Sequence, residues 1–309
     1  MKHVVISLLN FNGKKNTLEC LGSLKNIKRD NFRLTIMVVD NASTDGSVES
    51  IKHYVSSSKH DGIKVIENKE NLGFSGGHNV TIEYMFEGGA DYVLILNNDT
   101  YVQENFLEEL LKVGEQDNAI GILIPKIYFA PGFEFHKDRY SKEEKGKVLW
   151  YAGGEMDWAN VIGRNRGVDL VDKGQFDETE ETQLATGCCM LIKKEVIDMV
   201  GMLDNKYFLY YEDADLSMRA KRKGFKIVYV PNSIIWHKNA GSAGGSGSEL
   251  QDYYITRNRL IFGMKYALFR AKLALLKESF KLLLSGRYWQ KRGVIDFYLG
   301  KFGRGSSVI

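Results

Sequence analysis

The chain has 309 residues, of which 44% are hydrophobic and 26% are charged, with only 3 Pro and a formal net charge of +3. A chain of this length can bury a substantial core, and its composition excludes an intrinsically disordered, collagen-like or proline-rich protein. The small net charge provides no general attraction to nucleic acid, so we expect no nucleic-acid partner.

Two further features predict a soluble, reduced, cytoplasmic protein. No stretch approaches the roughly 18 consecutive apolar residues of a membrane-spanning helix, and the first residues, MKHVVISLLNFNG, are typical of a strand rather than a signal peptide. The three cysteines, Cys20, Cys188 and Cys189, are a poor disulfide framework for a chain this long. We interpret the adjacent pair as core residues.

The first third of the chain alternates continuous apolar runs with helical patterns. Helices are predicted over residues 15–27, 46–56 and 78–87. The predicted strands are His3–Leu9, Leu34–Val39, Ile63–Glu67 and Tyr92–Leu96. Strands of this kind, separated by helices, predict an α/β protein with a mostly parallel sheet covered on both faces.

The later part of the chain is less regular. Predicted strands are Gly121–Tyr128, Trp150–Trp158, Ala185–Ile192 and Ile227–Val230, the last ended by Pro231. Short helices are predicted over 195–202 and 212–223, and residues 241–248 (GSAGGSGS) are typical of a flexible loop. Residues 250–300 are predicted to be helical. We therefore divide the chain into a domain over 1–248 and a helical basic C-terminal extension over 249–309.

The extension differs in charge from the rest of the chain. Residues 250–309 carry 12 Lys and Arg against 3 Asp and Glu. The stretch from Lys265 to Arg292 is basic and amphipathic, which allows two interpretations. It is either a helix docked on the domain with a solvated basic face, or a surface that attaches to an anionic membrane.

Polar residues follow several of the predicted strands. Asn10, Asp40, the turn over 71–79 and Asp99 each come after a strand. In open α/β sheets ligands bind beyond the carboxyl ends of the strands, so these four positions are expected to face one crevice. The turn, NLGFSGGHN, has three glycines before a helix, an arrangement that lets backbone N–H groups approach an anion.

Two aspartates in this set have alternative interpretations. Asp99 is the sixth residue of the segment LILNNDT, where a carboxylate suits Mg²⁺ or Mn²⁺ but also suits a turn or a helix cap. Asp40, in VVDNASTDGS, is interpreted as a ligand of a nucleobase or ribose, whereas Ser43 and Asp45 are interpreted as capping residues. His237 alone indicates only a packed residue, but beside a metal-binding Asp99 it becomes a second ligand.

The segment FLYYEDADLSMR contains three acidic residues at the start of a predicted helix. Glu212 and Asp213 follow a run of aromatic residues, so they are expected in a partly desolvated place where a carboxylate acts as a general base. Acidic residues at this position also offset the helix dipole, which is the alternative explanation. Asp215 and Arg219 are predicted to form a structural ion pair.

Seven segments, in order along the chain, resemble the family 2 inverting glycosyltransferases with the GT-A fold, in particular bacterial rhamnosyltransferase-like members that build cell-surface polysaccharides. They span about residues 4–241, and YYITRNRLIF (253–262) also resembles a segment that follows the core of these enzymes. The matching segments are VVISLLNFNG (4–13), VVDNASTDGS (38–47), ENLGFSGGHN (70–79), LILNNDT (94–100), ATGCCMLIKKEV (185–196), FLYYEDADLSMR (208–219) and IIWHKNAG (234–241).

The resemblance implies a role for each matching residue. Residues 1–125 would form the nucleotide-sugar half and 126–248 the acceptor half. Asp99 would bind the metal, Mg²⁺ or Mn²⁺, with His237 completing the contacts, although the usual DXD motif is reduced here to Asn97-Asn98-Asp99. Asp213 would be the catalytic base with Glu212 beside it, and the two could exchange roles. The residues implied to line the nucleotide-sugar site are Asn10, Asp40, Asn71, Gly73, Asn79, Asn98 and Asp99.

The implied reaction moves a sugar from a nucleotide diphosphate to a glycan or lipid-linked glycan, with dTDP-rhamnose expected first and UDP-sugars next. The protein would act in the cytoplasm. Peripheral binding to the inner face of the cell membrane is the alternative location. One carboxylate base suffices for an inverting displacement. The alternatives are a nucleotidyltransferase and a non-catalytic nucleotide- or sugar-binding scaffold with the same fold. An NAD-dependent oxidoreductase is excluded because its glycine fingerprint is absent.

Overall fold

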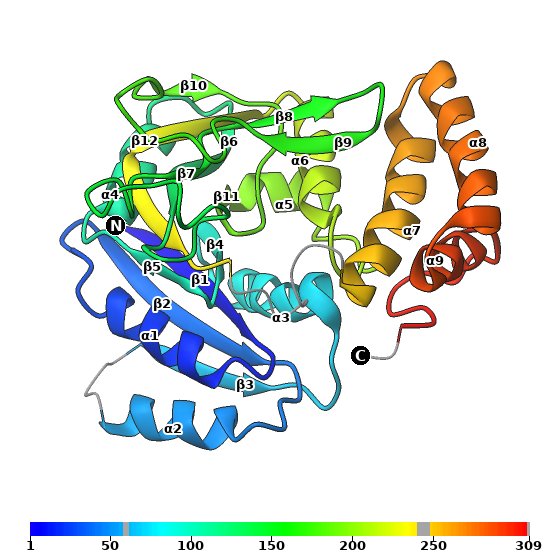
Figure 1. Ribbon diagram of the computed structural model, residues 1–309. Helices are drawn as coiled ribbons and strands as arrows, with labels where there is room; N and C mark the ends of the chain where they lie inside the picture. The colour runs from blue at the N-terminus through cyan, green and yellow to red at the C-terminus, as the bar shows by residue number, and fades with distance from the viewer. Residues whose placement is uncertain (58–61, 240–247, 308–309) are drawn as a thin grey trace.

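The computed structural model describes residues 1–57, 62–239 and 248–307 (Figure 1). The predicted loop over 241–248 therefore lies, apart from Ser248, outside the described residues. Within the described ranges the fold is one large, mostly parallel sheet flanked by helices, with a group of three helices at one side of the molecule. No helix of the described residues is long and apolar enough to cross a membrane.

The first third of the chain forms the parallel part of the sheet, as predicted. β1 pairs with β2 on one side and β4 on the other, and β2 pairs with β3, all in parallel. The strands are β1 (Lys2–Asn10), β2 (Phe32–Asp40), β3 (Ile63–Glu67) and β4 (Tyr92–Asn97). The helices between them are α1 (Lys14–Leu24), α2 (Ser47–Ser57) and α3 (Gly73–Gly88).

The later elements extend this sheet and add an antiparallel strand to its middle. β11 lies antiparallel between β4 and β6, and β12 continues the sheet beside β6. The strands are β5 (Thr100–Val102), β6 (Ile120–Phe129), β7 (Leu149–Tyr151), β8 (Gly154–Asp157), β9 (Ile162–Asn165), β10 (Glu180–Glu181), β11 (Cys189–Lys193) and β12 (Lys226–His237). The helices are α4 (Phe106–Gly114), α5 (Lys194–Val200) and α6 (Glu212–Arg222).

Several boundaries differ from the prediction, as where β11 begins at Cys189 and not at Ala185. β12 does not end at Pro231 but continues to His237, because the proline lies at a shift of register between Val230 and Ile234, where its missing N–H is tolerated. The predicted strand over 150–158 is two strands, β7 and β8. α3 begins at Gly73, so most of the glycine turn forms about the first two turns of the helix.

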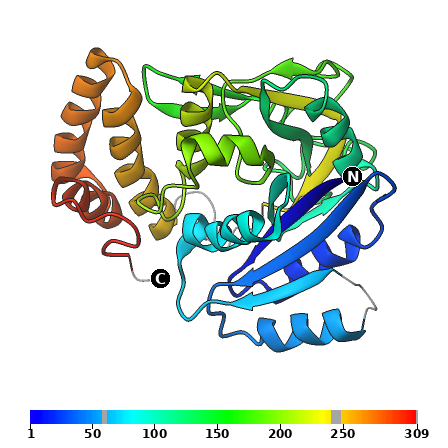
Figure 2. The same cartoon turned by 180° about the vertical axis from the view of Figure 1, so that it is seen from behind.

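The C-terminal extension consists of α7 (Glu249–Tyr266), α8 (Phe269–Ser285) and α9 (Tyr288–Tyr298). α8 lies farthest from the sheet in both views, with α7 between it and the rest of the molecule (Figures 1 and 2). The extension is not a separate unit. Its buried residues Leu260 and Phe262 share one apolar cluster with Val161, Leu184 and Ala214 of the preceding domain.

The main core lies on the sheet and the helices that flank it. It is built from completely buried aliphatic side chains of neighbouring strands, such as Ile6, Val38 and Leu94. All three cysteines are buried and unpaired, which confirms the adjacent pair as core residues. The core thus fixes the carboxyl ends of β1, β2 and β4 relative to one another, and these ends carry the polar residues described next.

Candidate active site

The ends of β1, β2 and β4 bring three predicted site residues together. Asn10 lies opposite Asp40 in the parallel register and donates its side-chain amide to the Asp40 carboxylate at 2.6 Å. The Oδ1 atom of Asn10 accepts from the Thr17 hydroxyl at 2.7 Å and from the Asn98 amide at 3.3 Å. Asp40 also accepts from the backbone N–H of Ser43 at 2.8 Å. The result is a preorganised polar cluster at the edge of the sheet where the strand order predicts a crevice.

Asn71 and Gly73 join this crevice through a residue that sequence analysis did not single out. Asn41, the first residue after β2, donates to Asn71 Oδ1 at 3.2 Å and to the Gly73 carbonyl at 2.9 Å. The Asn71 side chain in turn accepts from the backbone N–H of Gly73 at 2.8 Å. The turn before α3 is therefore fastened to the end of β2.

The N-terminus of α3 contacts the protein itself. The backbone N–H groups of Phe74 and Ser75 donate to the Phe208 carbonyl at 2.6 and 3.3 Å. Gly73 has φ +71°, and a Cβ atom there would lie 2.5 Å from the same carbonyl oxygen. Two N–H groups that the glycine pattern assigned to an anion are thus used to hold the loop before α6.

Asn79 is also committed to this loop. Its amide nitrogen donates to the Leu203 carbonyl and to Asn205 Oδ1, both at 2.9 Å, and its Oδ1 atom accepts from the Leu203 N–H at 3.1 Å. The side chain is almost completely buried. Asn79 therefore supports this loop, and its place in the lining of the nucleotide-sugar site stays a prediction.

Asp99 and His237 meet through the pairing of β5 with β12. In this antiparallel pair His237 lies opposite Thr100, and its Nε2 atom is 3.1 Å from Asp99 Oδ1. Both side chains are buried, and the His237 ring is edge-on to Trp150. Among the described residues the buried Nδ1 atom of His237 has no hydrogen-bond partner, which is unusual for a polar atom.

These two side chains fit a cation that is shared with a ligand. No group of three or more His, Cys, Asp or Glu side chains that could hold a metal is found over the ranges that the structure covers. Asp99 and His237 would therefore supply one oxygen and one nitrogen. Mg²⁺ and Mn²⁺ accept such a small protein contribution because they retain water and bind substrate phosphates.

Glu212 and Asp213 begin α6 directly after a strained stretch of backbone. Phe208, Tyr210 and Tyr211 have φ values of +64°, +69° and +74°, a region that residues with bulky side chains rarely adopt. Strained backbone of this kind persists only where its surroundings hold it, and it concentrates at functional sites. The three residues form half of the segment 206–211, which we call the catalytic loop because it precedes the predicted base.

The two carboxylates differ in their surroundings. Asp213 is partly exposed and accepts from the backbone N–H groups of Gly187 at 2.9 Å and Ala214 at 2.7 Å. Burial raises the pKa of Asp213, while these N–H groups act in the opposite direction. Burial, the main cause, and the charge of Asp213, the second, hold the pKa of Glu212 well above its ordinary value. Its Oε2 atom finds no hydrogen-bond partner in the part of the chain that the structure describes.

One short segment connects these carboxylates to the strand end that carries Asp99. Gly187 donates its N–H to Asp213, and the carbonyl of the next residue, Cys188, accepts from the N–H of Asn97 at 2.9 Å. Asn97 is the last residue of β4. The acidic pair of α6 and the end of β4 therefore lie on the two sides of a single dipeptide.

The catalytic loop is held by two buried residues of α7. Asn258 donates its amide to the carbonyls of Tyr207, Leu209 and Tyr210 at 2.8 to 2.9 Å. Arg257 donates to the Tyr207 carbonyl at 3.0 Å and is oriented by Asn258 Oδ1. In the sequence this segment stands out only through its resemblance to the family. The signal that was available is the adjacent Arg257-Asn258 pair, on a helix whose acidic residues, Glu249 and Asp252, lie in its first turn.

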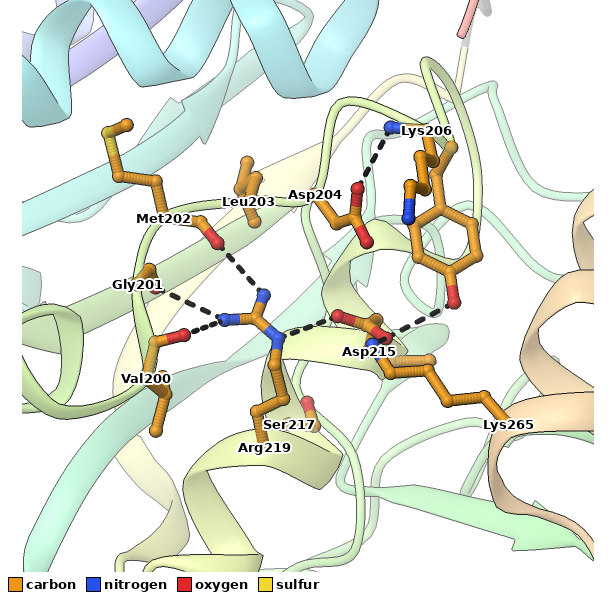
Figure 3. Close-up of polar contacts among 12 residues, drawn as sticks. Val200, Gly201, Met202, Leu203, Asp204, Lys206, Asp215, Ser217, Arg219 and Lys265 are labelled. Carbon is orange, nitrogen blue, oxygen red and sulfur yellow. Dashed lines mark hydrogen bonds and ion pairs between the residues drawn. The ribbon is translucent and has the colours of Figure 1, made fainter. Parts of the chain in front are cut away.

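A buried carboxylate also ties α6 to the extension (Figure 3). The predicted pair of Asp215 and Arg219 is confirmed at 2.7 Å, and Lys265 of α7 is a second cation at 2.6 Å. Burial raises the pKa of Asp215, but hydrogen bonds from Lys265 and Arg219 outweigh it, and the net pKa is lowered. Arg219 also donates to the carbonyls of Val200, Gly201 and Met202.

The fold and this site define a glycosyltransferase with the GT-A fold. The model of glycosyl transferase family 2 matches residues 4–201, so the chain belongs to that family. A solved structure of GalNAc-T7 with UDP, GalNAc and Mn²⁺ superposes with a TM-score of 0.61 over 97% of this chain and 57% of that one. At 15% sequence identity it shows the fold alone.

Two curated relatives are similar over about 70% of the chain. A low-salt glycan biosynthesis hexosyltransferase of Haloferax volcanii is 26% identical over 73% of this chain and 66% of its own length. The chain therefore spans slightly less than two thirds of the length of this relative. An N-acetylglucosaminyl-diphospho-decaprenol L-rhamnosyltransferase of Mycobacterium tuberculosis is 25% identical over 68% of each chain.

Proposed function

We propose that the protein is a metal-dependent inverting glycosyltransferase that moves a sugar from a nucleotide diphosphate to a hydroxyl of a glycan during polysaccharide synthesis. The observation that carries the proposal is the dipeptide Gly187-Cys188, which joins the acidic pair of α6 to the end of β4. A base and a diphosphate site must be neighbours for such a transfer, because the acceptor hydroxyl attacks the carbon that the diphosphate leaves.

The donor would bind at the ends of β1, β2 and β4. Asp40, held by Asn10 and Ser43, suits the nucleoside, since an ionised carboxylate accepts hydrogen bonds from a ribose or a base. Asn71, Gly73 and Asn98 border the same crevice. Asp99 and His237 would hold Mg²⁺ or Mn²⁺, and the ion supplies positive charge that stabilises the leaving diphosphate.

Asp213 would be the base and Glu212 its neutral neighbour. Because Glu212 is almost completely buried and its carboxylate lies beside that of Asp213, its protonated form is favoured. Asp213 is more exposed and receives two backbone hydrogen bonds, so it holds negative charge more readily. Two carboxylates whose surroundings separate their pKa values in this way can divide the roles of base and hydrogen-bond donor.

The donor and acceptor follow from the resemblance and from the relatives. We propose dTDP-rhamnose as the first donor and UDP-sugars as the next, supported by the rhamnosyltransferase name of the mycobacterial relative. The same name supports a lipid-linked glycan acceptor, which would bring the protein to the inner face of the cell membrane as a peripheral protein. Trp150, Trp158 and Tyr210 are partly exposed and would face the acceptor.

Isothermal titration with dTDP, UDP and GDP, each with and without Mn²⁺, tests the proposal. The expected result is binding of one diphosphate that depends on the metal and is lost in Asp99→Asn. Binding that is insensitive to the metal would contradict the role of Asp99 and His237. Lack of binding to all three, in a protein that unfolds cooperatively, would favour the non-catalytic scaffold.

A further inference from the structure

The outer face of α8 carries a stripe of apolar side chains. Phe269, Leu273, Phe280 and Leu284 are 74%, 43%, 60% and 84% exposed. At 3.6 residues per turn these four positions fall within about 60° of arc. The Tyr298 ring of α9 lies beside Phe280, with ring centroids 6.1 Å apart, and extends this surface. We call these five side chains the α8 stripe.

The opposite face of α8 explains why the stripe is not part of the core. Ala271, Leu275 and Ser279 are buried against the neighbouring helices of the extension. Glu278, the one acidic residue of α8, makes a two-pronged ion pair with Arg259 of α7, at 2.8 and 3.0 Å. The helix therefore has two apolar faces, of which only one is covered by the protein.

Cations flank the stripe on both sides. At 100° per residue, Lys272 lies on one side of the stripe and Arg270, Lys277 and Lys281 lie on the other. None of the ion pairs found in the described part of the chain involves these four side chains. An exposed apolar stripe with Lys and Arg at its borders matches the interface of an anionic bilayer, where apolar groups enter the acyl boundary and cations contact headgroups.

We infer that the outer face of α8 is a membrane-binding surface that lies on an anionic lipid bilayer. The inference deepens the proposed function, because it assigns the contact with a lipid-linked acceptor to one helix face. The surface itself stands on exposure and charge and does not depend on the chemistry of the donor site. A second copy of this chain would bring like charges together along the same stripe, which disfavours self-association.

Sedimentation of the full chain with vesicles tests this surface. We expect binding to vesicles that contain phosphatidylglycerol and much weaker binding to phosphatidylcholine alone. Phe280→Ser with Leu284→Ser should lower the partition coefficient roughly tenfold or more, since two large apolar side chains lose their burial. Lys277→Glu with Lys281→Glu should lower it at least roughly tenfold through charge reversal.

Two matched controls distinguish α8 from the general surface. Met199 of α5 is 60% exposed, the same as Phe280, and Lys142 lies on an exposed loop. Met199→Ser and Lys142→Glu should bind vesicles as the wild type does. All substituted side chains are exposed, so thermal unfolding should be unchanged. Equal binding by the α8 variants and the wild type would overturn the assignment to α8.

Other outcomes separate this inference from the proposed function. Wild-type protein that ignores phosphatidylglycerol vesicles but forms a dimer, with the dimer lost in Phe280→Ser/Leu284→Ser, would overturn the inference in favour of self-association. Vesicle binding by a protein that binds no nucleotide diphosphate would leave the α8 surface in place and contradict only the glycosyl transfer. Transfer to a water-soluble acceptor should be the same in the α8 variants and the wild type.

Discussion

The backbone N–H of Phe74 donates to the carbonyl of Phe208 at 2.6 Å. This hydrogen bond joins the first turn of α3, on the nucleotide side, to the catalytic loop that precedes Glu212. Gly73 makes the approach possible, because any side chain at this position would collide with the Phe208 carbonyl. The proposed donor side and the proposed catalytic side are thus in direct backbone contact.

Gly73→Ala should therefore destabilise the protein and impair transfer. Gly46→Ala is a matched control, because Gly46 has φ +75° but a Cβ atom there would meet nothing within 4 Å. The control should cost about 1 kcal/mol from backbone strain alone, and Gly73→Ala should cost more. Urea unfolding and kcat are the measurements. If Gly73→Ala and Gly46→Ala lost the same stability, and Gly73→Ala kept the wild-type kcat, the contact with Phe208 would not matter for either property.

Asn258→Asp should reduce kcat with little effect on the binding of nucleotide. The substitution keeps the shape of the side chain but replaces the amide that donates to three carbonyls of the catalytic loop with a carboxylate that repels them. Misplacement of a catalytic group by about 1 Å can reduce the rate about 100-fold. We expect a loss of that order in kcat, with the KM for the donor nearly unchanged.

The control for this variant is Asn26→Asp, an exposed position after α1 with the same change of charge. It should leave kcat at the wild-type value. If Asn258→Asp raised the KM for the donor as much as it lowered kcat, Asn258 would act on the fold in general. That outcome would contradict its role as a positioning residue for the catalytic loop.

Asp213→Asn should reduce kcat by roughly 100-fold to 10,000-fold and so nearly abolish transfer. The binding of nucleotide should stay nearly intact. Because burial raises the pKa of Asp213, the base loses its proton at a higher pH than an ordinary aspartate does. The wild-type kcat/KM should accordingly rise with pH through a limb above the usual aspartate range of about 3.9. This limb should disappear in the variant.

Glu212→Gln tests the division of roles between the two carboxylates. Glutamine resembles the protonated side chain that burial favours at this position, so the loss in kcat should be much smaller than in Asp213→Asn. If the order of the two losses is reversed, Glu212 is the base. The two groups interact, so the pH limb belongs to the pair until both variants are measured.

Asp215→Asn should destabilise the fold by on the order of 3 kcal/mol, because it leaves Arg219 and Lys265 without their shared carboxylate. The pKa of Asp215 is lowered in the folded state, so its contribution to stability is present above the ordinary carboxyl pKa and is lost as the pH falls through the lowered value. The difference in unfolding free energy between wild type and variant should therefore shrink below about pH 4.

The control is Asp198→Asn, which breaks the exposed pair of Lys194 and Asp198 at the same helical spacing. An exposed pair of this kind is worth about 0.5 kcal/mol or less. Chemical denaturation between about pH 3 and pH 7 measures both variants. A pH-independent deficit in Asp215→Asn would show that the carboxylate acts through packing and not through its charge.

The parallel strands and the residues at their ends were predictable, because buried strands are continuous apolar runs and their carboxyl ends meet at one edge. The family followed from seven ordered segments. β12 was cut short at Pro231 because a proline normally ends a strand, and sequence alone does not show the shift of register that accommodates it. β9 and β10 were missed since each is short and has little apolar character.

The support of the site was less predictable than the site. Asn10, Asp40 and Asn98 follow local patterns, whereas Asn258 lies 48 to 51 residues from the carbonyls that it binds. A contact of that kind follows from tertiary packing and leaves no periodic signal in the sequence. Lys265 was assigned to a basic tail for the same reason, although its side chain reaches the buried Asp215.

The attachment of the catalytic loop to α7 has a consequence for synthesis of the chain. A ribosome releases the N-terminal part first, so the sheet with Asp40 and Asp99 can form before the last helices emerge. The Tyr207, Leu209 and Tyr210 carbonyls of the catalytic loop gain the Asn258 amide only when α7 follows, and the Lys206 carbonyl accepts from Gly303 still later. A nascent chain can thus form the strand ends proposed to bind the donor while the proposed base, Asp213, still lacks its final support from α7.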